Sequence, residues 1–162
     1  MAGSARLDLW RAGVFVIAVD TNVLVYAHRR ETDLHQAAFA LMRDLAEGDR
    51  AWAIPWPCCY EFLSIVTNRR IWKEAATPPA RAWRQLEAWT ASPSNRLLGE
   101  TDDFLKLLGG LVQRSRVRGA ILHDARIAAI CLAHGAEALL TRDRDFALFP
   151  ELNTRDPFRR RN

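Results

Sequence analysis

The feature that most constrains the fold is an uninterrupted apolar run near the N-terminus. Residues Val14–Val19 are six apolar residues in succession, and Asp20 follows them directly. Because successive side chains of a strand point to opposite faces, a run without polar alternation predicts a strand buried on both sides. Strands of this kind are typical of parallel sheets covered by helices. We therefore expect a central strand at Val14–Val19, followed by a short helical stretch that begins around Asp20-Thr21-Asn22.

Further short strands and helices alternate along the rest of the chain. The other predicted strands are Ala51–Ile54, Arg96–Gly99 and Ala138–Thr141. Between and after them, apolar residues recur at helical spacing. Strands that alternate with helices predict helices on both faces of a parallel sheet. The expected fold class is therefore α/β, a three-layer α/β/α arrangement around a central parallel sheet.

The boundaries of five helices are predicted from residues that favour helix ends. Asp33 and Gln36 form a predicted capping box at the start of the first helix, which ends at Gly48. The second helix is expected to start at Pro55 and Pro57, the third at Pro78 and Pro79, and the fourth at Thr101. The fifth is expected to run from Asp124 to Gly135. On the third helix we expect Trp83, Leu86 and either Trp89 or Thr90 to lie on one apolar side.

The length and composition fit a single folded domain. The chain has 162 residues, of which 49% are hydrophobic, enough for one core. We expect the domain to span residues 14–157, with an irregular leader at residues 1–13 and a basic C-terminal tail at residues 158–162. No stretch is apolar for long enough to cross a membrane.

Charge and cysteine content narrow the function classes. The formal net charge of +4 favours a polyanionic partner. The three cysteines, Cys58, Cys59 and Cys131, form no C-x-x-C pair, so neither a disulfide framework nor a zinc site is indicated. Their number and spacing fit a protein of the reducing cytoplasm.

Four carboxylates are expected at one end of the sheet. Ligands of open parallel sheets bind beyond the carboxyl ends of the strands. Asp20 follows the first predicted strand, and Asp143 follows the last one, with Asp145 two residues further on. Glu61 lies in the first turns of the helix that begins at Pro57, and Asp124 begins the helix that leads into the last strand. The topology therefore predicts that these side chains converge.

Carboxylates that converge repel one another and do not all ionise easily without a cation. Mg²⁺ and Mn²⁺ prefer carboxylate and water oxygens, and no cluster of Cys or His competes as a ligand set. Such ions lower the pKa of bound water and offset charge on a phosphoryl transition state. A divalent cation is thus the expected cofactor, and replacement of Asp20 or Asp124 by asparagine is expected to abolish activity that depends on it while the fold remains.

Each of these residues also has a purely structural interpretation. Asp20 and Asp124 could be helix caps or favourable charges at helix N-termini. Glu61 could be an ordinary exposed glutamate, and Asp143 and Asp145 could be turn residues. Together the structural interpretations are less convincing, because the topology places all of the residues at one end of one sheet. His123 is expected to lie near the site, with no catalytic role.

The assembled motifs resemble the PIN-domain family, and within it the VapC-type toxins. The matching pieces, in the family's order, are Val19-Asp-Thr-Asn-Val-Leu-Val-Tyr26, Glu61 within Glu-Phe-Leu-Ser-Ile-Val-Thr67, Asp124 within His-Asp-Ala-Arg-Ile-Ala-Ala-Ile130, and Leu140-Thr-Arg-Asp-Arg-Asp-Phe146. One departure is Arg126, where the family more often has an apolar residue. It is either a surface difference or a phosphate contact.

The resemblance implies an acidic metal site formed by Asp20, Glu61, Asp124 and Asp143. Further positions that it implies are an accessory Asp145 and the polar residues Thr21, Asn22 and Thr141, which orient the carboxylates. It also implies Mg²⁺ or Mn²⁺ and endoribonuclease activity on structured RNA such as tRNA or rRNA. The partners that it implies are a second copy in a homodimer and a cognate VapB-like antitoxin, and no membrane.

Two other functions are compatible with parts of the sequence. A phosphatase of the haloacid dehalogenase type also places an acid after its first strand and uses Mg²⁺, but it needs D-x-D where this chain has Asp20-Thr21-Asn22. A catalytically decayed PIN-like RNA-binding protein is the second alternative, although decay normally removes at least one of the acids. A dinucleotide enzyme is disfavoured, because neither G-x-G-x-x-G nor a P-loop occurs.

An inhibitor is expected to combine apolar and ionic contacts. We predict an inhibitor helix on an apolar groove near Trp52, Trp56 and Phe62, and an arginine that pairs with the carboxylates.

Overall fold

A five-stranded parallel sheet forms the centre of the computed structural model, which describes residues 16–159. The strands are β1 (Ile17–Val19), β2 (Trp52–Pro55), β3 (Asn95–Leu98), β4 (Ala138–Leu140) and β5 (Thr154–Arg155), in the spatial order β3-β2-β1-β4-β5. Every pair of neighbouring strands is parallel. All carboxyl ends therefore point to the same edge, and the central β1 lies between β2 and β4.

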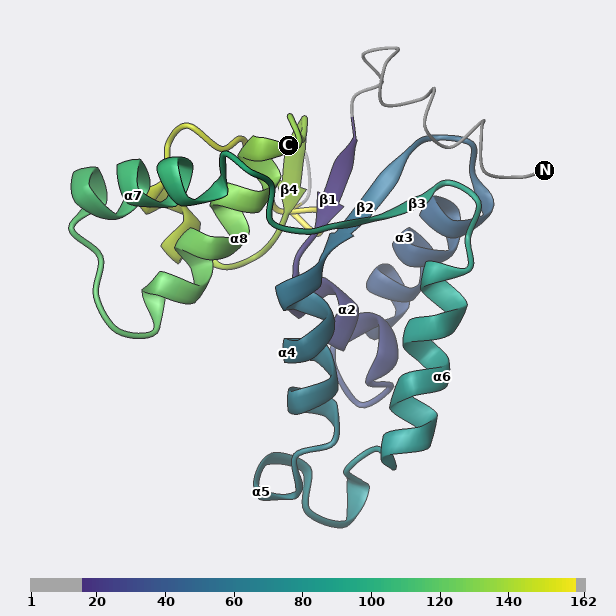
Figure 1. Ribbon diagram of the computed structural model, residues 1–162. Helices are drawn as coiled ribbons and strands as arrows, with labels where there is room; N and C mark the ends of the chain where they lie inside the picture. The colour runs from purple at the N-terminus through teal and green to yellow at the C-terminus, as the bar shows by residue number, and fades with distance from the viewer. Residues whose placement is uncertain (1–15, 160–162) are drawn as a thin grey trace.

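Helices cover the sheet on both faces, as predicted. They are α2 (Thr21–His28), α3 (His35–Glu47), α4 (Trp56–Val66), α5 (Arg69–Trp72), α6 (Pro79–Thr90), α7 (Phe104–Ser115) and α8 (Ile121–Ala133), with short 3-10 turns η1 (Lys73–Ala75) and η2 (Arg144–Leu148). In Figure 1, α7 and α8 lie on one side of the sheet and α3 and α6 on the other. The predicted three-layer α/β/α fold is confirmed.

The strands are buried on both faces, as the apolar run indicated. Every residue of β1, β2 and β4 is buried, and Ala18 and Val19 have no exposed surface. The strand is shorter than predicted, because β1 begins at Ile17, while Val14 and Phe15 lie outside the described residues. The expected leader, residues 1–13, and the last three residues of the expected tail lie outside them as well.

Two predicted helix caps are wrong. Leu34 occupies the N-cap of α3 and makes no side-chain cap, so Asp33 and Gln36 form no capping box. The Thr32 hydroxyl fixes this turn by donating to the carbonyl of Arg29. Thr101 does not cap α7 with its hydroxyl, which is buried without a partner, although its carbonyl accepts the amide of Phe104.

Three further predictions need correction. α8 begins at Ile121 rather than at Asp124, because the preceding turn, with Gly119 at φ 60°, starts the helix earlier. Trp83 is 52% exposed, and Ala82 faces the core of α6 together with Leu86 and Trp89. Strand β5 was not predicted, since its two residues are polar and partly exposed. Among residues 16–159 no helix is both long and apolar enough to cross a membrane.

Candidate active site

Asp20 lies where β1 ends and α2 begins, at the centre of the carboxyl edge of the sheet. Its carboxylate accepts hydrogen bonds from the Thr21 amide at 2.8 Å and from the Asn22 amide group at 2.7 Å. The residue is the N-cap of α2 and is only 4% exposed. Asp20 is therefore a helix cap, as its structural interpretation proposed, and it also lies at the sheet edge where the site was expected.

Thr141 connects the ends of β1 and β4. Its hydroxyl donates to Asp20 Oδ2 at 2.7 Å, and its oxygen accepts from the Asn22 side chain at 3.0 Å and from the Asp143 amide at 2.9 Å. Asp143 in turn caps η2, because its Oδ1 accepts the Asp145 amide at 2.8 Å. Thr141 thus orients one carboxylate with its side chain and positions the backbone of another.

Glu61 reaches the same edge from α4. The Thr21 hydroxyl donates to Glu61 Oε2 at 2.6 Å, while the Thr21 backbone amide binds Asp20. α4 begins directly after β2, with Pro55 as its N-cap and Pro57 in its first turn, so the strand end determines where Glu61 lies. A residue of α2 therefore holds a carboxylate of α4 beside the end of β1.

Three acids form the tightest carboxylate group. Oxygen atoms of Asp124, Asp143 and Asp145 all lie within 4.8 Å of one another. Asp20 and Glu61 are outside this group of three, but their charges act on it. Asp145, expected to be accessory, is thus placed in the group together with Asp143. The convergence predicted from topology is observed.

The environment raises the pKa of two of these acids. Burial raises the pKa of Asp20 to about 6, against hydrogen bonds from Thr141 and Thr21 that favour the charged form. Loss of hydration also raises the pKa of Asp124 to about 7, and repulsion from Asp143, Asp20 and the other acids adds to the effect. Both shifts mean that the protein offers these carboxylates too little positive charge.

The donor set fits a hard divalent cation. Within residues 16–159, no salt bridge joins a basic side chain to Asp20, Glu61, Asp124, Asp143 or Asp145. The groups that converge are carboxylates and hydroxyls, which suit Mg²⁺ or Mn²⁺ better than softer metals. A bound cation would offset the repulsion between these carboxylates and would favour their charged forms.

One neighbour of the site was not predicted. The Cys58 thiol lies 3.7 Å from Asp20 Oδ1 and is fully buried. Burial raises the pKa of Cys58 well above its usual range, so the thiol stays protonated and can donate to the carboxylate. The sequence did not indicate this contact, because no motif links Cys58 to Asp20.

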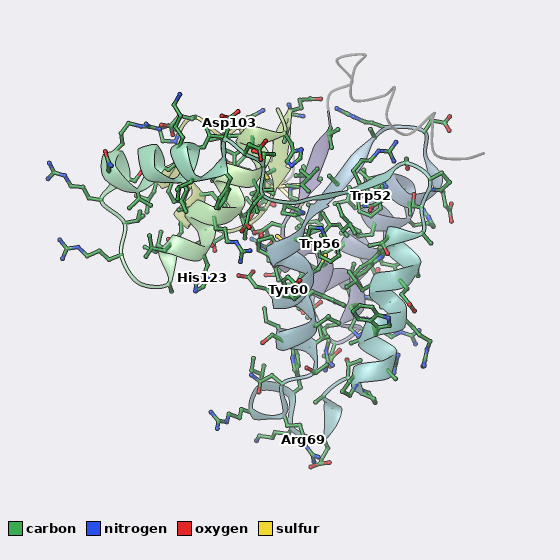
Figure 2. The ribbon with its side chains drawn as sticks, in the orientation of Figure 1. Trp52, Trp56, Tyr60, Arg69, Asp103 and His123 are labelled. Atoms are coloured by element: carbon green, nitrogen blue, oxygen red, sulfur yellow. The ribbon has the colours of Figure 1, made fainter. Side chains whose placement is uncertain are left out.

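The side chains of Trp52, Trp56 and Phe62 do not form the apolar groove that was predicted from the sequence. Trp52 and Phe62 have no exposed surface and belong to the core, and of the three only Trp56 is accessible. Figure 2 shows Trp52 on the strand that precedes α4 and Trp56 at the start of that helix. Strand burial and the inward face of α4 explain the difference.

Comparisons with known proteins agree with this fold and identify the family. The PIN domain family model matches residues 17–152. Ribonuclease VapC43 of Mycobacterium tuberculosis is 34% identical, over 88% of this chain and 95% of the relative, and ribonuclease VapC48 of the same species is 30% identical, over 86% and 95%. The chain belongs to the PIN-domain family, and within it to the VapC ribonucleases.

Solved structures share the fold at low sequence identity. VapBC2 from Rickettsia felis, bound to a promoter DNA fragment, superposes with a TM-score of 0.63 at 18% identity and covers 87% of this chain and 98% of that one. The sarcin-ricin loop cleaving toxin VapC20 of Mycobacterium tuberculosis superposes with a TM-score of 0.58 at 20% identity, over 81% and 92%. Several of these neighbours are toxins solved together with their antitoxins.

Proposed function

We propose that this protein is a metal-dependent endoribonuclease toxin that hydrolyses phosphodiester bonds in structured RNA of the tRNA or rRNA class. The observation that carries the proposal is the group of Asp124, Asp143 and Asp145, whose charge no basic side chain among the described residues neutralises. Family membership supplies the hydrolase class, and the VapC20 structure is described as that of a toxin that cleaves a structured RNA loop. The family assignment also argues against the phosphatase alternative.

Asp20, Glu61, Asp124 and Asp143 are the residues that would hold Mg²⁺ or Mn²⁺, with Asp145 as an accessory ligand. When bound, such an ion would lower the pKa of a water molecule and offset charge on the phosphoryl group. The chain's own contribution is orientation. Thr21 fixes Glu61, and Thr141 with Asn22 fixes Asp20, so the carboxylates need little rearrangement during a reaction.

The proposed partners are RNA, a second copy of the chain and a VapB-like antitoxin. An antitoxin arginine would pair bidentately with the carboxylates and would compete with the cation for the same negative charge. A reducing cytoplasm is the proposed compartment, because the thiols of Cys58, Cys59 and Cys131 are free and buried.

A cleavage assay with the purified protein tests the activity. Total tRNA and rRNA are incubated with Mn²⁺ or Mg²⁺, and fragments are mapped by their 5′ ends. We expect discrete cuts that disappear in excess chelator and return when the cation is restored. Retardation of RNA without any cut, across both RNA pools and both cations, would favour the decayed RNA-binding protein.

Expression in a bacterial host tests the toxin role. The chain alone should arrest growth, and the product of a neighbouring small gene should restore it and form a stable complex. Normal growth with confirmed expression, and no complex, would indicate a housekeeping nuclease.

A further inference from the structure

A cavity beside the carboxylates has no role in the site described so far. Its volume is about 440 Å³, and it is lined by Pro57, Tyr60, Glu61, Ser64, His123 and Arg126. We propose that it is a subsite for one unpaired nucleobase of the RNA substrate. The inference rests on the proposed ribonuclease function and deepens it, because it names the feature of the RNA that the protein would bind next to the scissile phosphate.

The two walls of this cavity come from the helices that carry the acids. Tyr60 precedes Glu61 on α4, and His123 precedes Asp124 on α8. Figure 2 shows Tyr60 and His123 on opposite sides of the space between these helices. Glu61 itself lines the cavity, whereas Asp124 lies beside it, since neighbouring residues of a helix point about 100° apart and His123 is the lining residue on α8. A strand with its phosphate at the carboxylates would thus have an adjacent base at the cavity.

Tyr60 lines the cavity and stacks on a second exposed aromatic residue, Trp56. The rings of Trp56 and Tyr60 are stacked, with centroids 6.2 Å apart and an interplanar angle of 30°. Trp56 is 41% exposed and Tyr60 is 62% exposed, although both are large apolar side chains. Proteins bind single-stranded RNA by stacking unpaired bases on such aromatic rings. A base in a duplex is already stacked on its neighbours, so this surface would select unpaired nucleotides.

Arg126 contributes a fixed planar cation to the opposite wall. Its Nε and Nη2 atoms both bind Glu100 Oε1, at 2.7 and 2.6 Å. The pairing holds the guanidinium in place while the side chain remains partly exposed and lines the cavity. A guanidinium plane can stack on a base or donate to its edge. The subsite would thus assign Arg126 a contact with a base of the RNA.

Binding measurements with two RNA probes test the subsite. Fluorescein-labelled oligo(A) and an abasic ribose-phosphate oligomer of the same length are titrated with the full chain in excess chelator, and a gel checks that the RNA stays intact. Tyr60→Ala should weaken binding of oligo(A) on the order of tenfold and leave the abasic probe unchanged, because stacking requires a base. Tyr60→Phe should bind both probes like the wild type.

Phe39→Ala supplies the matched control. Phe39 is a 54% exposed aromatic residue on α3 that does not line the cavity, so its removal should leave both affinities unchanged. Circular dichroism and gel filtration of each variant accompany the titrations. The proposal would be overturned if Tyr60→Ala weakened binding of both probes equally or did not weaken it at all. It would also be overturned if the variant no longer formed a dimer seen for the wild type, because Tyr60 would then be a subunit contact. A wild-type chain that binds neither probe and cuts no RNA would refute the ribonuclease function itself.

Discussion

At the scale of single residues, Asp124 is the carboxylate whose role in activity is most distinct from any role in the stability of the fold. It begins no helix, no hydrogen bond holds its side chain in the manner of Asp20, and burial and repulsion raise its pKa to about 7. Removal of its charge should therefore relieve repulsion without disrupting the fold.

We expect Asp124→Asn to lose RNA cleavage on the order of 100-fold or more, since groups that only support metal ligands already cost 10–100-fold when they are removed. In excess chelator near pH 8, the variant should also melt at a higher temperature than the wild type, because a neutral amide ends the repulsion. Cleavage rates and thermal melts check both effects. A folded variant with full activity would contradict the assignment of Asp124.

Thr141 should act by positioning. Thr141→Val removes the donor to Asp20 Oδ2 and the acceptor of the Asp143 amide but keeps the side-chain volume. We expect kcat to fall 10–100-fold with little change in KM for RNA, and Thr141→Ser to restore most of the rate. An unchanged kcat in the valine variant would show that the carboxylates do not depend on this hydroxyl.

Asp143 is expected to matter more than Asp145, because it is closer to the end of β4 and its backbone amide is fixed by Thr141. The structure places both carboxylates in one group with Asp124, so both can contribute to binding of the cation. Single alanine variants, compared by cleavage rate at saturating Mn²⁺, rank them. A far greater loss in Asp145→Ala would exchange their roles.

At the scale of elements, Arg29 connects the end of α2 to the segment between α4 and α6. Its Nη1 donates to the Ala75 carbonyl at 2.8 Å and to the Thr77 hydroxyl at 3.1 Å, and its guanidinium lies 3.8 Å from the ring centroid of Trp72. The side chain is almost fully buried and also pairs with Glu31.

Arg29→Met should destabilise the protein by about 1–3 kcal/mol, because the carbonyl and hydroxyl lose their donors inside the structure. Limited proteolysis should cut within residues 67–78 faster than in the wild type. Arg70→Met, which changes an exposed arginine in the same segment, is the control and should behave like the wild type. Equal cleavage of both variants would show that the buried guanidinium does not hold the segment.

The elements also show which signals in the sequence were sufficient. Apolar runs predicted β1, β2 and β4, because burial on both faces leaves a pattern that few other structures share. The acids were predictable at the edge, since each follows a strand or lies near a helix start. The cap at Asp20 was predictable, but those expected at Asp33 and Thr101 were not found, because Leu34 and Asp103 occupy the N-cap positions without a side-chain hydrogen bond. Strand β5 lacked an apolar run altogether, and Cys58 reaches Asp20 only through the packing of α4.

At the scale of the whole molecule, the carboxylate group links stability to pH and to metal. Asp20 and Asp124 have folded pKa values of about 6 and 7, above the ordinary value of 3.8. Between about pH 4 and pH 7 these two groups therefore bind more protons in the folded state than in the unfolded state, and their contribution to stability falls as pH rises. Burial lowers the pKa of His28, and this single group acts in the opposite direction.

In excess chelator, the melting temperature should be higher near pH 5 than near pH 8, by several degrees. One pKa unit corresponds to about 1.4 kcal/mol, and pH 5 lies about one unit below the folded pKa of Asp20, so this buried residue alone would account for about 1.4 kcal/mol. Added Mn²⁺ near pH 8 should reverse the loss, because a bound cation replaces the protons. A metal-free protein that melts at a higher temperature near pH 8 than near pH 5 would contradict the inferred repulsion.

The double role of Asp20 restricts how this protein can change over evolutionary time. Its carboxylate accepts from a helix amide, an asparagine and a threonine at once, and an asparagine in its place would set its amide nitrogen against two donors that already point there. The expectation that asparagine at position 20 leaves the fold intact therefore needs correction, because loss of the Asp20 carboxylate would also disturb the start of α2. A descendant that abandons nuclease activity can discard Asp124 or Asp143 and remain folded. Silenced copies of this gene should therefore keep the aspartate at position 20 longest, as the last trace of a lost activity.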